Sequence, residues 1–379
     1  MLEQGADGSI PHVVPECIGF KGNSSAAWGD AAVICPWELY LATGDKELLS
    51  EHFGMMKKWI GYMHAYGDDK SEEYGWMGGK HFGDWLAMDA GYGIYVGATQ
   101  TDFIASAFFA YSTSLVIKAG KVLGEDTSYF EDLYVKVRAR FRECFMKDGM
   151  PCSYNSEELG LEEAQKKQVQ SVIKSVTQTA IVLILRFGLY EESERAALID
   201  KLVELIDEND GRMTTGFVGT PHILHALSDH GRTDKAFDLL LQEKNPSWMF
   251  SVNMGATTIW EHWDSINEKG EMWSTRMNSF NHYAYGSVFD WVYGDMLGIK
   301  ICDDGAAYTK VVFAPLTDKR IGFAEGSIET RQGKIASSWR YIGDKVRYEF
   351  TVPENTVATI KLAGGFERTV GGGTYVIVR

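Results

Sequence analysis

The residues with the clearest chemical potential lie in one short segment, Ala256-Thr-Thr-Ile-Trp-Glu-His-Trp-Asp264. Glu261 stands between two indoles, Trp260 and Trp263, and is followed by His262. Partial removal of water around a carboxyl group raises its pKa toward the range in which the group works as a general base. The segment therefore indicates a general base at Glu261, and a solvated glutamate without a chemical role is the alternative.

Three further segments combine acidic residues or a histidine with aromatic residues. Trp28 precedes Asp30 at the predicted start of a helix, and Asp84 precedes Trp85 in a Gly-rich loop. His282 lies near the start of another predicted helix. Indole rings pack on the C–H faces of sugars, and carboxylates accept hydrogen bonds from sugar hydroxyls. Taken singly, Asp30 also fits a helix N-cap, Asp84 a local turn and His282 a cap or core position.

Composition excludes several classes of function. The formal net charge of -15, without a run of Lys and Arg, disfavours nucleic acid as a partner. The five cysteines are scattered and include no CxxC pair, so we expect neither a disulfide framework nor a metal site, and no cofactor. No signal peptide and no apolar run of about 18 residues is visible, so a membrane partner is not expected. We expect a cytoplasmic protein, unless an export signal precedes Met1.

The spacing of apolar residues changes along the chain. It is mostly helical from residue 30 to 297 and alternates with period 2 beyond residue 300. We predict helices at 30–42, 45–66, 101–123, 126–146, 170–187, 191–206, 217–229, 232–243 and 279–297, and strands at 308–313, 335–341, 345–352, 356–362 and 375–378. Long loops at 67–100, 147–165 and 245–278 are expected to be functional. With 379 residues, two domains are expected, at 1–298 and 299–379.

Together and in order, these segments resemble the motifs of glycoside hydrolase family 78, the α-L-rhamnosidases. The motifs are Ala-Trp-Gly-Asp-Ala-Ala-Val with Pro-Trp-Glu-Leu-Tyr, Gly-Asp-Trp-Leu, Thr215-Gly-Phe-Val-Gly-Thr-Pro221, Ala-Thr-Thr-Ile-Trp-Glu and Ser-Phe-Asn-His-Tyr-Ala-Tyr-Gly. The resemblance runs from about Pro11 to the end of the chain.

The resemblance implies a mainly α chain with a β domain: an incomplete (α/α)6 barrel followed by a small antiparallel β-sandwich. It also implies inverting hydrolysis of terminal α-L-rhamnose, with rhamnose-containing glycosides or oligosaccharides as partners and Glu261 as the general base. The residues that would line the sugar pocket are Trp28, Asp30, Asp84, Trp85, Trp260 and His282.

One part of the family pattern does not occur in this sequence. Inversion uses two carboxyl groups about 6.5–9.5 Å apart. The family's general acid lies in an Arg-Asp-Glu-Arg-Leu-Gly-Trp-Thr-Gly-Asp type stretch before the Pro11-His-Val-Val-Pro15 region, so here the acid is unknown and expected upstream of Met1. Twelve helices form such a barrel, against the nine predicted. We therefore expect impaired activity and self-association through the open barrel.

Three alternatives stay open at this point. The chain could be a non-catalytic carbohydrate-binding relic or one piece of a split glycosidase. It could be another inverting hydrolase or a phosphorylase of the same barrel class, although no phosphate loop is visible. A purely structural helical protein would leave the ordered set of motifs unexplained.

Overall fold

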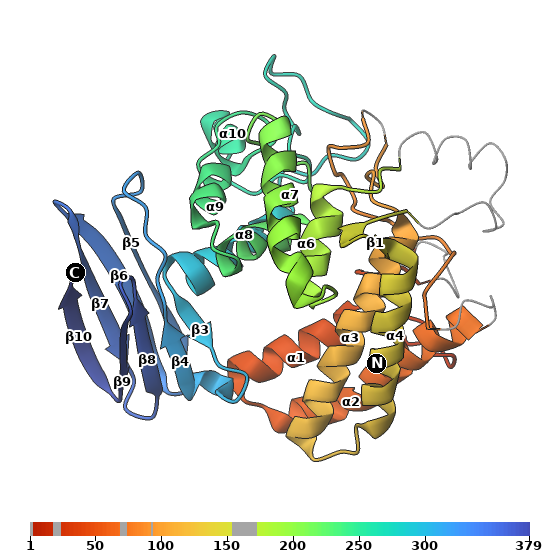
Figure 1. The fold of residues 1–379 in the computed structure, drawn as a ribbon, viewed down its shortest axis with the longest axis horizontal. Helices are drawn as coiled ribbons and strands as arrows, with labels where there is room; N and C mark the ends of the chain where they lie inside the picture. Colours follow the sequence, from red (N-terminus) through yellow and green to blue (C-terminus); the bar gives the residue numbers. More distant parts are fainter. Residues whose placement is uncertain (1–2, 18–23, 69–73, 92–93, 154–172) are drawn as a thin grey trace. The chain divides into compact units, whose positions relative to one another are not determined.

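The computed structural model describes residues 3–17, 24–68, 74–91, 94–153 and 173–379 (Figure 1). Contacts between Cα atoms divide the chain into two compact units. Unit 1 comprises Met1–Ile34 and Glu51–Gly286, and unit 2 comprises Cys35–Ser50 and Ser287–Arg379. The domain boundary that the sequence suggests at residue 298 stays a prediction.

The first two helices are α1 (Ala31–Thr43) and α2 (Lys46–Asp68). Each has one part in unit 1 and the other part in unit 2. Unit 1 continues with consecutive helices that pack in pairs: α3 (Thr101–Leu123) with α4 (Ser128–Phe145), α6 (Gln178–Phe187) with α7 (Arg195–Glu208), and α8 (Thr220–Asp229) with α9 (Thr233–Leu240). Figure 1 shows α3 and α4 side by side. These pairs are the helical hairpins that short connections predict.

Burial differs between the two helices of a pair. In α6 every residue except Arg186 is buried, whereas α7 buries only the stripe that includes Leu198, Leu202 and Ile206. Helix α6 also packs against α3 and α8, the first helices of the neighbouring pairs. A helix that is apolar all round lies inside, and one with a single apolar stripe covers it. Each hairpin thus has an inner and an outer helix.

Helix α3 is long and apolar enough to cross a membrane by length and composition. It is 23 residues long, and 78% of its most apolar stretch is buried against other parts of the protein. Core helices of this kind pass the same test, so α3 is explained as an inner helix of unit 1.

The helix ends follow from local sequence. The Thr177 hydroxyl accepts a hydrogen bond from the Ala180 N–H at 3.0 Å and so caps α6 at its start. Gly188 and Gly124 end α6 and α3 in the left-handed region, at φ 66° and 75°. These caps position the loops that carry the candidate site.

The predicted helix at 279–297 is wrong in its first five residues. Residues 279–283 are not helical, and Ala284–Ser287, α11 (Val288–Trp291) and Val292–Met296 form successive 3-10, α and π turns. The Ser279 carbonyl and the His282 N–H are bonded to a distant segment instead, so they are not available to a helix.

A further predicted helix begins later than expected, and one helix was not predicted. Helix α6 begins at Gln178, and residues 170–172 of the predicted helix lie outside the described residues. Helix α10 (Trp248–Asn253) was not predicted, and it lies inside the loop expected at 245–278. The Ser247 hydroxyl caps it by accepting from the Phe250 N–H at 3.0 Å.

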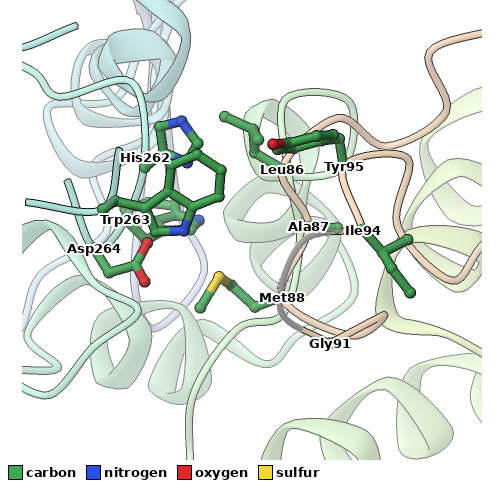
Figure 2. Close-up of a pocket in the computed structure, with 10 residues that line it drawn as sticks. Leu86, Ala87, Met88, Gly91, Ile94, Tyr95, His262, Trp263 and Asp264 are labelled. Carbon is green, nitrogen blue, oxygen red and sulfur yellow. The ribbon is translucent and has the colours of Figure 1, made fainter. Parts of the chain in front are cut away.

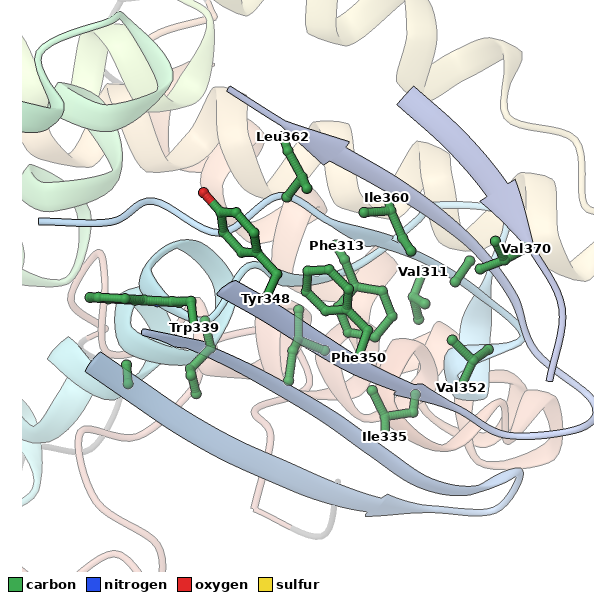
Figure 3. Close-up of a cluster of buried hydrophobic side chains, with 14 of the residues drawn as sticks. Val311, Phe313, Ile335, Trp339, Tyr348, Phe350, Val352, Ile360, Leu362 and Val370 are labelled. Atoms are coloured by element: carbon green, nitrogen blue, oxygen red, sulfur yellow. The ribbon is translucent and has the colours of Figure 1, made fainter. Parts of the chain in front are cut away.

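Unit 2 contains two four-stranded sheets. One has the order β10-β7-β6-β5 and the other β3-β4-β8-β9. The bounds are β3 (Ile299–Ile301), β4 (Lys310–Phe313), β5 (Phe323–Thr330), β6 (Gly333–Ile342), β7 (Lys345–Val352), β8 (Val357–Leu362), β9 (Phe366–Val370) and β10 (Gly373–Val378). Side chains of both sheets form one core (Figure 3). In this core the ring centroids of Phe313 and Phe350 lie 4.7 Å apart.

The sandwich confirms the predicted strands and adds to them. Gly343, Gly364 and Gly365 have positive φ in the tight turns that join β6 to β7 and β8 to β9. Strands β3, β5 and β9 were not predicted, and neither was the short hairpin of β1 (Met146–Lys147) and β2 (Met150–Pro151). Within the two sheets all strand pairs are antiparallel except β4 with β8, which is parallel.

Candidate active site

Glu261 lies where two distant segments pair through their backbones. Its N–H donates to the Ser279 carbonyl and its Oε2 accepts from the Ser279 N–H, both at 2.8 Å. The His282 N–H donates to the Ile259 carbonyl at 2.9 Å. The pairing holds Glu261 and His282 on adjoining stretches of chain, and both side chains are partly exposed.

His282 is oriented by its neighbours. Its ring stacks on Phe217 with centroids 5.0 Å apart, and Nδ1 accepts from the Ala284 N–H at 3.3 Å. In a neutral imidazole with Nδ1 as acceptor, the proton is on Nε2. His282 can therefore present a hydrogen-bond donor to a ligand.

The tryptophans beside Glu261 are turned inward. Trp260 is 5% exposed and packs edge to face on Phe280. Trp263 is 2% exposed and stacks on Tyr285 with centroids 3.8 Å apart. Trp260 is therefore mostly buried, and the expectation that it lines the sugar pocket stays a prediction.

Asp84 is fully buried, and its carboxylate is surrounded by donors. Oδ1 accepts from the backbone N–H groups of Val218 at 2.8 Å and Gly219 at 3.1 Å. Oδ2 accepts from the Gly216 N–H at 2.9 Å and the Thr179 hydroxyl at 2.5 Å. Burial raises the pKa of Asp84, while these hydrogen bonds lower it. Asp84 thus joins the 84–87 loop to the start of α8, and the expectation that it lines the sugar pocket stays a prediction.

Gly216 makes this arrangement possible. A Cβ at Gly216 would lie 2.2 Å from the Trp85 carbonyl oxygen and 2.6 Å from the Ala87 nitrogen. Only glycine allows the backbone to approach the loop so closely. The motifs Gly-Asp-Trp-Leu and Thr-Gly-Phe-Val-Gly therefore meet as one packed unit.

Asp30 is the second buried carboxylate. Its Oδ1 accepts from the Trp59 indole at 2.9 Å and the Ser112 hydroxyl at 2.5 Å, and its Oδ2 accepts from the Ala27 N–H at 2.8 Å. Burial raises the pKa of Asp30, and the hydrogen bonds oppose this. Asp30 anchors the start of α1 to α2 and α3, and the expectation that it lines the pocket also stays a prediction.

The predicted tryptophans Trp28 and Trp85 are partly exposed and belong to one aromatic row. Trp28 packs on Phe82 at 4.8 Å between centroids, and Phe82 on Trp85 at 5.7 Å. Trp85 stacks on Tyr95 at 5.2 Å. Tyr95 meets Trp273 edge to face at 5.7 Å. The structure thus joins two predicted sugar-binding residues through rings that the sequence did not single out.

The row ends at a pocket that includes residues missed by sequence reasoning. Asp264, Tyr95 and Trp273 line it together with Leu86, Met88 and His262 (Figure 2). Two features of the sequence could have indicated these residues. Trp263-Asp264 repeats the pairing of an acidic residue with Trp, and the loops at 67–100 and 245–278 were expected to be functional.

The charges near this site interact. Burial raises the pKa of Asp264 and lowers that of His262, so His262 is neutral at pH 7. Burial, with the carboxylates of Asp84, Asp264 and Glu261, raises the pKa of Tyr285 well above 10.0.

Known families match both parts of the chain. The family described as bacterial alpha-L-rhamnosidase 6 hairpin glycosidase domain matches residues 1–296. The chain belongs to this family. The family described as bacterial alpha-L-rhamnosidase C-terminal domain matches residues 298–376. The resemblance read from the motifs is thereby confirmed, as is the six-hairpin fold.

Individual relatives agree with the rhamnosidase family. The chain is 35% identical to an alpha-L-rhamnosidase of Formosa agariphila and 37% identical to one of Alteromonas sp., in each case over 94% of this chain and 36% of the relative. A crystal structure of Streptomyces avermitilis alpha-L-rhamnosidase complexed with L-rhamnose matches 100% of this chain and 35% of that chain, with 31% identity and a TM-score of 0.86. The chain spans about a third of the length of these relatives.

Proposed function

We propose that this chain carries part of an inverting α-L-rhamnosidase site, in which Glu261 activates the water that attacks a terminal α-L-rhamnose. The observation that carries the proposal is the placement of Glu261. Its partly exposed carboxylate is held by the Ser279 N–H at 2.8 Å, with His282 on the adjoining stretch of chain. The names of the relatives and the L-rhamnose bound in the Streptomyces avermitilis structure support the substrate class.

The proposal places Trp28, Trp85 and His282 around the sugar. The two indoles offer partly exposed rings for the C–H face, and His282 offers the Nε2 proton to a hydroxyl. Asp30 and Asp84 hold the surrounding loops. Their carboxylates are already engaged by three and four donors respectively.

Inversion also needs a general acid, because two carboxyl groups share the work. We propose that the acid belongs to a segment outside these 379 residues, as the family motif implies. The chain alone then hydrolyses rhamnosides slowly, since loss of general-acid assistance costs about 10² to 10⁴-fold. Robust turnover by the purified chain would contradict this part of the proposal.

The test replaces the base and leaves its neighbours in place. Release of 4-nitrophenol from 4-nitrophenyl α-L-rhamnopyranoside is measured for the chain, for Glu261→Ala and for Glu268→Gln, an exposed carboxylate in the same loop. We expect Glu261→Ala to lose about 10² to 10⁴-fold in rate. Glu268→Gln should keep the original rate.

Two further readouts identify the role of Glu261. Azide needs no deprotonation to act as a nucleophile, so it should restore part of the rate in Glu261→Ala and none in the unmodified chain. Proton NMR of the first product should show the β anomer of L-rhamnose. An unchanged rate in Glu261→Ala, or a first-formed α anomer, would overturn the proposed mechanism.

A further inference from the structure

Unit 2 has a hollow on the outer face of its β10-β7-β6-β5 sheet. It encloses about 660 Å³, within the range of small-molecule sites. Side chains alternate between the two faces of a strand, and Ile335, Trp339 and Phe350 point into the core (Figure 3). Ala336 and Ser338, which alternate with these residues on β6, therefore lie on the outer face. The hollow shares no residue with the proposed rhamnose site.

The floor of the hollow consists of short side chains. Ala336 on β6 pairs with Ser327 on β5 and with Thr351 on β7, so the three lie in one row across the sheet. Ser338 lies in the next row, two positions along β6. Longer side chains stand at the rim, among them Lys334. A sheet face with short groups at its centre and long groups around them has a recess that a ligand can enter.

Two carboxylates stand on opposite sides of this floor. Ser338 pairs with Glu325 on β5 and with Glu349 on β7. Because neighbouring strands lie about 4.8 Å apart, the backbones that carry the two glutamates are about 9.6 Å apart. Glu349 forms an ion pair with Arg347 at 2.7 Å, whereas Glu325 has no ion-pair partner among the described residues. This spacing suits a sugar ring, whose hydroxyls can donate to both carboxylates.

Other polar groups of the hollow are also unengaged. The hydroxyls of Ser327, Ser338 and Thr351 have no hydrogen-bond partner within the described parts of the chain. The ammonium group of Lys334 forms no ion pair with any described residue. The hollow therefore offers a donor, acceptors and hydroxyls that act as both.

This chemistry selects among possible occupants. A protein partner needs aromatic or aliphatic anchors, and Ala336 is the largest apolar side chain among the described residues that line the hollow. The two glutamates and the net charge of -15 disfavour nucleic acid. A neutral sugar chain carries hydroxyls that both donate and accept, which match these groups. A chain of uronic acids would bring further carboxylates beside Glu325 and Glu349.

We propose that this hollow is a second carbohydrate site, which binds a neutral oligosaccharide through hydrogen bonds to Glu325, Glu349 and the hydroxyls of the floor. The site goes beyond the proposed function, because it lies in unit 2 and takes part in no step of rhamnoside hydrolysis. No aromatic ring is among the described residues that line it, so hydrogen bonds supply the affinity, which is modest. Such a site retains a sugar polymer on the protein.

The test measures binding to the whole chain by calorimetry. The neutral probes are cellohexaose, xylohexaose and mannohexaose, and hexagalacturonic acid is the charged probe of the same length. L-rhamnose is present throughout at a saturating concentration, so that the proposed site around Glu261 is occupied. We expect at least one neutral hexasaccharide to bind with a Kd on the order of 10⁻⁴ to 10⁻³ M. Hexagalacturonic acid should bind at least about tenfold more weakly.

Variants assign the binding to the hollow. Ala336→Leu fills the floor and should weaken binding of the neutral hexasaccharide at least about tenfold. Glu325→Gln keeps the shape and removes the charge, so it should weaken binding about fivefold, because hydrogen bonds to charged groups are the stronger ones. Thr359→Leu makes a matched change on the outer face of the other sheet and should leave the Kd unchanged. The three side chains are at least partly exposed, so the urea midpoints of unfolding should stay similar.

The outcomes separate this site from the proposed function. No binding of any neutral hexasaccharide, or a Kd unchanged in both Ala336→Leu and Glu325→Gln, would overturn the second site. Tighter binding of hexagalacturonic acid would overturn the neutral class of ligand. Ala336→Leu should also release 4-nitrophenol from the aryl rhamnoside at the rate of the unmodified chain, which supports a site that is separate from hydrolysis.

Discussion

Two segments of unit 1 pair an acidic residue with tryptophan, and they turn that pair in opposite directions. In Asp84-Trp85 the carboxylate is fully buried and the indole is partly exposed. In Trp260-Glu261 the indole is 5% exposed and the carboxylate is partly exposed. Each pair thus exposes one of its two side chains and buries the other.

The difference depends on what the backbone offers beneath each segment. Gly216, Val218 and Gly219 present N–H groups at the start of α8, which suit an anion. Beneath Trp260 lies the ring of Phe280, which suits an indole. The same pair of residue types therefore builds a structural anchor in one place and an exposed acid in the other.

The strongest test of the anchor is Asp84→Ala. The change leaves three N–H groups and the Thr179 hydroxyl buried without their acceptor. We expect the free energy of unfolding to fall by about 3–5 kcal/mol, measured by urea denaturation. A loss below about 1 kcal/mol would show that water or a rearranged loop replaces the carboxylate.

A second acid in the Asp84 loop tests how burial affects an acid with fewer donors. Asp89 accepts from the Ala98 N–H at 2.8 Å, and burial, opposed by that bond and by Lys174, raises its pKa from 3.8 to about 6. The folded state therefore binds the proton more tightly, and stability falls as pH rises from about 4 through 6.

Asp89→Asn should remove this pH dependence. The free energy of unfolding of Asp89→Asn minus that of the unmodified chain should increase by up to about 3 kcal/mol between pH 4 and pH 7. This magnitude follows from the rise of the Asp89 pKa from 3.8 to about 6 on folding. Chemical denaturation at each pH provides the measurement. A difference that stays constant over this range would exclude Asp89 as the titrating group.

The smallest effect on stability is expected at the exposed acid. Glu261→Gln keeps an oxygen that can accept from the Ser279 N–H, and the side chain is already partly in water. The free energy of unfolding should stay within about 0.5 kcal/mol of the original value. If Glu261→Gln instead destabilises the protein as strongly as Asp84→Ala, Glu261 is an anchor too and the contrast between the two segments disappears.

The sequence predicts the architecture well because periodicity reports burial directly. Helices such as α3 and α7 and strands such as β7 have long, regular apolar patterns. Strand β5 escapes prediction because two of its inward positions carry small residues: Ala324 is buried and Gly326 lies against Leu297, while Ile328 alone packs on the core as a large apolar side chain. A strand that fills its side of the core with small groups has little hydrophobic alternation.

The site is predicted only in part, for a different reason. Motifs locate the segments, and the structure keeps Glu261, His282, Trp28 and Trp85 partly exposed. Which member of an acid–aromatic pair is buried depends on distant partners such as Ser112 for Asp30 and the α8 backbone for Asp84. These hydrogen-bond partners lie 82 and 134 positions apart in the sequence, so no local sequence pattern predicts them.

The contact between Asp84 and the glycines before α8 also constrains how the two motifs can change in evolution. Replacing Gly216 would push a side chain into the Trp85 carbonyl, and replacing Asp84 would leave the glycine N–H groups without their acceptor. Neither motif can change alone without loss. We therefore expect relatives that lack the aspartate to lack Gly216 as well, although the two positions are 132 residues apart.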